Sequence, residues 1–85
     1  MLKALYAAEM ILHEQRVFNR DAEMVLFAML DEGMSFDEAL ESWAEFSGQR
    51  RDDIEDRMNR SCRLTCKANV RYLLERCCEV YEHEN

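Results

Sequence analysis

The chain has 85 residues, of which 48% are hydrophobic, with two glycines, no proline and a net charge of −7. This length is near the lower limit for one hydrophobic core, so we expect a single domain over residues 1–85. Abundant Ala, Leu, Met and Glu, without strand-like alternation, predict an all-α fold. The apolar runs are too short to span a membrane and no signal-peptide pattern begins the chain, so we expect a cytoplasmic protein with reduced cysteines.

The first half of the sequence predicts two helices. An apolar arc over residues 2–18 indicates the first helix, and Asn19 or Asp21 can cap the second. The second helix holds the run 24–30, which is apolar on every side, and it should end at Gly33. A helix that is apolar all round needs burial all round. We expect a second copy of the chain to supply this cover, in a homodimer or a larger assembly; the alternative is that the other helices of the same chain wrap it.

Ser35 and Glu38 have the spacing of a capping box, which predicts a third helix over about 36–46 that stops near Gly48. This helix carries an apolar stripe at helical spacing. The stripe can dock on the core, or part of it can form an exposed ridge that binds a partner.

A long C-terminal helix is predicted by residues 51–81, which contain neither Gly nor Pro and repeat an apolar residue every three or four positions. Such a helix would be roughly 45–48 Å long. The predicted architecture is therefore a small bundle of three shorter helices packed on one long helix (about 50–82). We expect it to dimerise through the second helix and the apolar seam of the fourth. This seam consists of Ile54, Met58, Cys62, Cys66, Val70, Leu73, Cys77 and Val80.

Charge is segregated along the chain. Residues 31–56 contain ten acidic and two basic residues. This region can be an ordinary solvated face, but dense carboxylates on a rigid helical body can also imitate a phosphate backbone and bind a basic surface. In size and charge the chain resembles small acidic phage anti-defence proteins that inhibit restriction or CRISPR enzymes. The resemblance implies a protein partner with a basic, nucleic-acid-binding surface. The predicted partner-binding residues are six acids and two aromatic anchors: Glu38, Glu41, Trp43, Glu45, Phe46, Asp52, Asp53 and Asp56.

Residues 57–76 have the opposite character, with six basic residues and one acidic residue. On a helical wheel, five of the basic residues fall within roughly 120° of arc. They are Arg57, Arg60, Arg63, Lys67 and Arg71. This basic stripe can pair with the acidic middle of the same chain or of a partner subunit. Alternatively, it can contact the phosphates of a nucleic acid, which is the second function that we consider.

Ala44, Gly48 and Ile54 have the spacing of a helix-turn-helix, a resemblance that covers residues 40–59. The helix that would enter the DNA groove has four acidic residues among its first seven, 50–56, and DNA would repel them. We interpret this segment as a packing corner between two helices.

The four cysteines do not form a zinc motif on one continuous helix. Cys66 and Cys77 would be about 16 Å apart, so a shared zinc ion would need the helix to break near 68–69, or ligands from two chains. We interpret Cys62, Cys66 and Cys77 as core thiols and expect Cys78 to be the reactive thiol. We expect no metal and no cofactor.

No catalytic motif is found in the sequence. His13 and Glu14 begin a zinc-protease pattern, but Val17 replaces the second histidine. No paired-carboxylate site, phosphate loop or activated nucleophile is recognisable, so we expect a binding protein and not an enzyme.

Overall fold

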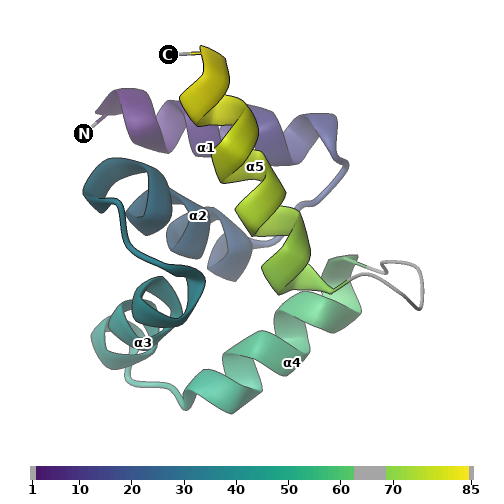
Figure 1. Ribbon diagram of the computed structural model, residues 1–85. Coiled ribbons are helices and arrows are strands. Elements are labelled where there is room, and N and C mark those ends of the chain that lie inside the picture. Colours follow the sequence, from purple (N-terminus) through teal and green to yellow (C-terminus); the bar gives the residue numbers. More distant parts are fainter. Residues whose placement is uncertain (1, 63–68, 85) are drawn as a thin grey trace.

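The computed structural model describes residues 2–62 and 69–84, with side chains described for 3–61 and 69–83. Within these ranges the chain forms five α-helices and no strand (Figure 1), which confirms the all-α fold. The helices are α1 (Leu2–Glu14), α2 (Arg20–Glu32), α3 (Phe36–Ser47), α4 (Arg51–Cys62) and α5 (Val70–Glu84). None of these described helices is long and apolar enough to cross a membrane.

The apolar helix α2 is the centre of the fold. The other four helices all pack against it (Figure 1). Val25 and Leu26 are completely inaccessible to solvent, and Met29 is nearly so. Burying side chains of this size stabilises the fold by about 1.5–3 kcal/mol each. Helices of the same chain therefore bury α2, as in the second of the two alternatives. Burial of α2 does not need a second copy of the chain.

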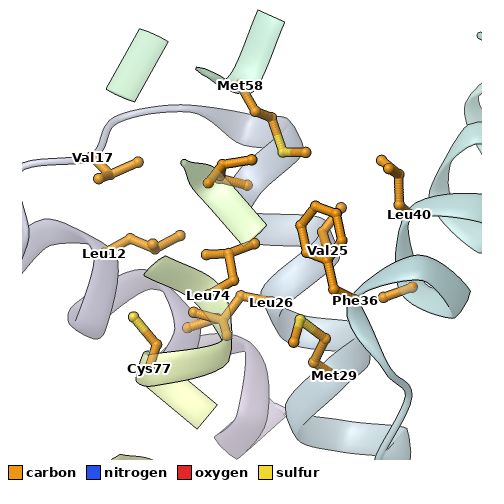
Figure 2. Packing of buried hydrophobic residues seen from close by; sticks show 14 of the residues in the cluster. Leu12, Val17, Val25, Leu26, Met29, Phe36, Leu40, Met58, Leu74 and Cys77 are labelled. Carbon is orange, nitrogen blue, oxygen red and sulfur yellow. The ribbon is translucent and has the colours of Figure 1, made fainter. Parts of the chain in front are cut away.

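One hydrophobic cluster joins all five helices, and Figure 2 shows its side chains converging from each of them. The labelled members are Leu12 from α1, Val17 from the following turn, Val25, Leu26 and Met29 from α2, Phe36 and Leu40 from α3, Met58 from α4, and Leu74 and Cys77 from α5. The cluster fixes which face of each helix is left for solvent, and so decides which polar residues can form a binding surface.

The helix ends that the sequence predicts are confirmed at α2 and α3. Asn19 accepts a hydrogen bond from the Ala22 amide (2.9 Å) at the start of α2. Ser35 and Glu38 form the complete capping box at the start of α3. Both glycines adopt the left-handed conformation that ends a helix, with φ of 68° at Gly33 and 70° at Gly48.

Helix α1 is shorter than the predicted span of 2–18. Arg16 takes the left-handed conformation (φ 60°), and the Val17 amide donates back to the Leu12 carbonyl (2.8 Å). This is the hydrogen-bond pattern of a helix C-terminus that glycine usually closes. The turn buries Val17 in the core and leaves the neighbouring Phe18 exposed.

The prediction of one long helix over 50–82 is wrong, because this part of the chain forms α4 and α5 as separate helices. The Val70 amide donates to the Asn59 side chain (2.8 Å). In one continuous helix these residues would be about 16 Å apart. Asn69 begins α5 by accepting from the Tyr72 amide (2.9 Å). The described residues span only 32 × 29 × 18 Å, too short for a helix of the predicted length.

Candidate partner-binding surface

Six of the eight predicted partner-binding residues lie on the second half of α3 or the first half of α4, whereas Glu38 and Glu41 lie earlier on α3. Gly48 reverses the chain between the two helices. On α4, Ile54 and Met58 are buried one turn apart, which leaves the acidic residues around them facing outward. We use the name acidic corner for five exposed residues of these two helices: Glu45, Phe46, Asp52, Asp53 and Asp56.

Phe46 is the apolar centre of the acidic corner. Its side chain is 84% exposed, the largest exposure among the big hydrophobic residues that the structure describes. The ring stacks on Trp43, with centroids 5.8 Å apart and an interplanar angle of 20°. Stacking in an offset arrangement is a favourable aromatic geometry. The Phe46 ring therefore packs on Trp43, and most of the side chain remains open to solvent.

Trp43 is fixed in turn by Asp21 of α2. The Trp43 indole N–H donates to Asp21 Oδ1 (2.8 Å), and Arg57 Nε donates to Asp21 Oδ2 (3.1 Å). Arg57 also donates to Gln49 Oε1 (2.6 Å). Asp21 is 8% exposed and lies in the first turn of α2, where the helix dipole favours a negative charge. The Asp21 carboxylate of α2 therefore binds one side chain from α3 and one from α4, and Gln49 of the α3–α4 turn holds the second of these.

This network gives Trp43 a structural role that the sequence analysis missed. The indole is partly buried and anchors the aromatic stack, so Phe46 alone of the two predicted anchors presents a largely exposed ring. The sequence contained one signal for Asp21, since it was a candidate cap of the second helix. Its pairing with Trp43 and Arg57, 22 and 36 residues away, depends on the tertiary fold.

Two of the predicted acids are occupied within the chain. Glu38 accepts a hydrogen bond from the Ser35 amide and forms no ion pair with a described residue. Hydrogen bonds from the Ser35 amide and then from its hydroxyl lower the pKa of Glu38. Glu41 pairs with Arg51 (3.3 Å). By contrast, none of the four acids of the acidic corner forms an ion pair in the part of the chain that the structure describes.

A second ion cluster, which the sequence analysis did not single out, is centred on Asp37 of α3. Its carboxylate is bonded by two guanidinium groups, from Arg51 of α4 (2.9 Å) and from Arg71 of α5 (2.8 and 2.9 Å). These bonds, first from Arg71 and then from Arg51, hold the pKa of Asp37 well below its usual range. Arg71 also lies over the Phe36 ring, 4.6 Å from its centroid, in a cation–π contact.

The basic stripe is not assembled as the helical wheel predicted. Arg57 lies on α4 and Arg71 on α5, so they do not share a helix face. Arg57 is bound to Asp21, and Arg71 is bound to Asp37 in the acidic middle. Arg60 is exposed and forms no ion pair among the described residues. Arg63 and Lys67 lie outside the described residues.

The described thiols are poorly suited to chemistry. Cys77 is buried and Cys78 is half-buried, and burial raises the pKa of each thiol to about 11. A thiol with such a pKa is almost fully protonated at neutral pH and is a weak nucleophile. Burial therefore disfavours the reactive thiolate that the sequence suggested for Cys78, although Cys78 is the less buried of the two described thiols. The side chains of Cys62 and Cys66 lie outside the described residues, and the rest contain no group of three potential metal ligands.

Comparisons of this chain with protein-family models, with curated proteins and with solved structures found no match.

Proposed function

We propose that this chain is a small acidic all-α binding protein that acts by protein–protein contact through the acidic corner, and not an enzyme. The single observation that carries the proposal is the largely exposed ring of Phe46, which stacks on Trp43. Glu45 is its neighbour in sequence, and Asp52, Asp53 and Asp56 are exposed on the next helix. A rigid aromatic residue at low conformational cost is the usual anchor of a protein interface.

The charges define the kind of partner. Glu45, Asp52, Asp53 and Asp56 have no cationic partner in the described part of the chain, so they favour a protein with a basic surface. The ion pairs elsewhere point in the same direction, because Arg51 and Arg71 neutralise Asp37 and Glu41, whereas no described cation pairs with these four acids. A basic surface of this kind is typical of enzymes that bind nucleic acid. Inhibition of such an enzyme, as phage anti-defence proteins achieve it, is the specific activity that we propose.

A cytoplasmic location belongs to the same proposal. The free thiols of Cys77 and Cys78 suit a reducing compartment.

Nucleic-acid binding by Arg57, Arg60, Arg63, Lys67 and Arg71 has less support. Two of the three described members are held by intramolecular carboxylates, and breaking those pairs would cost free energy before any phosphate could be contacted.

Charge reversal tests the proposal. The triple variant Glu45→Lys, Asp53→Lys, Asp56→Lys should lose capture of its partner from cell lysate in a nuclease-treated pull-down read by mass spectrometry. Glu45→Lys places a positive charge near the end of α3, which the helix dipole favours, and Asp53→Lys places one near the start of α4, which the dipole disfavours. Because these two effects oppose each other, folding should be retained.

A control variant separates local from overall charge. Glu32→Lys, Glu75→Lys, Glu82→Lys changes the net charge equally at exposed positions of α2 and α5. It should retain the partner. Equal capture by both triple variants and the unmodified chain would refute a role for the acidic corner.

A further inference from the structure

The face formed by α1 and α5 carries most of the large apolar side chains that the described part of the chain exposes. Tyr6 and Met10 of α1, and Tyr72 and Val80 of α5, are exposed and line one groove of about 650 Å³. Both helices pack on α2, whereas their own backbones approach each other closely at very few positions. An apolar patch gathered on one face of a small chain marks an interaction surface.

We propose that this groove is the interface of a homodimer, in which α1 of one copy packs antiparallel against α1 of its partner. The first argument is local charge. Two copies with a net charge of −7 repel each other, so they can meet only where the surface is close to neutral. The groove meets this condition, because Lys3 and Arg76 lie on its wall together with Glu14.

The second argument is that the charges on α1 are self-complementary. The groove-lining residues of α1 begin at Lys3 and end at Glu14 or the adjacent Gln15. The two charged residues are about 16 Å apart along the helix. A twofold axis at the middle of α1 places Lys3 of each copy opposite Glu14 of the other, which forms two equivalent ion pairs. A parallel arrangement would place like charges together.

The third argument is that both charges are available. Neither Lys3 nor Glu14 forms an ion pair with any other described residue. The same twofold operation places Tyr6 opposite Ile11 and Ala7 opposite Met10, so that apolar residues of unequal size face each other along the contact. Such pairing of large with smaller side chains allows two helices to pack closely.

This dimer differs from the one that the sequence predicted through the second helix, since α2 is covered within its own chain. It is also independent of the proposed partner, because the acidic corner belongs to α3 and α4. The two proposals can therefore fail separately.

Sedimentation velocity over a concentration series tests the dimer, with Lys3→Glu and Glu14→Lys as the main variants. Each change alone sets like charges against each other twice and should raise the dissociation constant roughly tenfold or more. An equimolar mixture of the two variants should form a heterodimer of nearly unmodified affinity. Both changes suit the dipole of α1, so circular dichroism should show unchanged helicity.

A second variant tests the apolar contact. Tyr6→Glu with Met10→Glu should give a monomer, whereas the triple variant of the acidic corner should dimerise like the unmodified chain. The proposal would be overturned by an unmodified chain that stays monomeric, by a dimer that survives Tyr6→Glu with Met10→Glu, or by charge variants that fail to pair. A monomer whose groove binds the apolar dye ANS, with binding lost in Tyr6→Glu, would overturn it too and assign the groove to another apolar occupant.

Discussion

Asp21 is the one charged residue that the fold buries among those described, and it has two donors directed at it. Removing the carboxylate would leave the Trp43 indole N–H and Arg57 Nε without their acceptor, while Arg57 would keep its bond to Gln49. An unsatisfied buried donor costs about 1–3 kcal/mol. Because Arg57 is 41% exposed, water can replace part of what it loses.

We therefore expect Asp21→Ala to lower the free energy of unfolding by about 1–3 kcal/mol. Asp21→Asn should cost less, because its amide oxygen can still accept from Trp43. Urea titrations followed by fluorescence of the single tryptophan measure both. An alanine variant as stable as the unmodified chain would show that the network contributes nothing to folding.

Arg16 is the only non-glycine residue with a positive φ in the described chain. The left-handed conformation costs an L-residue roughly 1–2 kcal/mol, and Arg16→Gly would remove this cost. Glycine has more conformational freedom in the unfolded chain, which offsets part of that gain. Arg16→Gly should therefore stabilise the protein by about 0.5–1 kcal/mol. Gly48→Ala, where a Cβ meets no neighbouring atom but φ is 70°, should destabilise it by a similar amount. Thermal unfolding of both variants checks the two signs; a midpoint lowered by Arg16→Gly would contradict the account.

At the scale of secondary-structure elements, two asparagines define the junction of α4 and α5. Asn69 caps the Tyr72 amide within α5, and Asn59 reaches from α4 to the Val70 amide. Asn69→Ala should cost about 1 kcal/mol, the usual value of an N-cap, whereas Asn69→Asp should be tolerated. Asn59→Ala should cost a similar amount by removing the bond between helices. Urea midpoints measure these effects; if Asn69→Ala and Asn69→Asp were equally stable, the cap would have no role.

The sequence predicted the helix ends at which a residue typical of caps stands, but not the end of α1, where Arg16 takes the place of the usual glycine. Asn19 at α2 and the Ser35–Glu38 box at α3 act within one helical turn, so their spacing is sufficient. The separation of α4 from α5 was missed because no Gly or Pro marks it. It depends on the bond between Asn59 and Val70, eleven residues apart, which exists only once the two helices pack.

The apolar seam of the C-terminal half was predicted in part. Ile54, Met58, Val70 and Cys77 are buried as expected. On α5, however, Leu74 is fully buried in place of the expected Leu73, which is only partly buried. In a continuous helix, the angular position of the apolar side around the helix axis would have continued from α4 into α5. Once the helix is interrupted, each half turns its own apolar side to the core.

At the scale of the whole molecule, Asp37 joins α3 to both α4 and α5 through Arg51 and Arg71. The pKa of its carboxyl group is lower in the folded chain than the usual value of about 3.9 in an unfolded one. The folded state therefore binds this proton more weakly than the unfolded state. Its contribution to stability is present above the unfolded pKa and is lost as the pH falls below about 4.

We accordingly expect Asp37→Asn to be less stable than the unmodified chain at neutral pH, with a difference that shrinks as the pH falls below about 4. Urea midpoints across the acidic range measure this difference. A stability difference that stays constant down to the lowest pH would contradict the role assigned to the ionised carboxylate.

Glu23 serves as a control, because removal of its charge should have the opposite effect on stability at neutral pH. Burial raises its pKa, and the neighbouring Glu9 adds to the effect. The charged form of Glu23 is therefore disfavoured in the folded state, and Glu23→Gln should stabilise the protein at neutral pH but not below the unfolded pKa of about 4.3.

The acidic corner was predictable from the sequence in composition but not in detail. Local charge density identified Glu45, Asp52, Asp53 and Asp56, because so many acids close together in sequence cannot all be buried or paired. The difference in exposure between Trp43 and Phe46 could not be predicted from the sequence, since it depends on a carboxylate of α2. The pairing of Arg71 with Asp37 likewise depends on how α5 crosses α3.

The measurement that tests the central claim most directly is quantitative capture of a partner from nuclease-treated lysate by Phe46→Ala and Phe18→Ala. Phe18 is a matched control, because it is 72% exposed and packs edge-on against His13, distant in sequence from the acidic corner. We expect Phe46→Ala to lose the partner and Phe18→Ala to keep it. Equal capture by the two variants and the unmodified chain would contradict partner binding through Phe46.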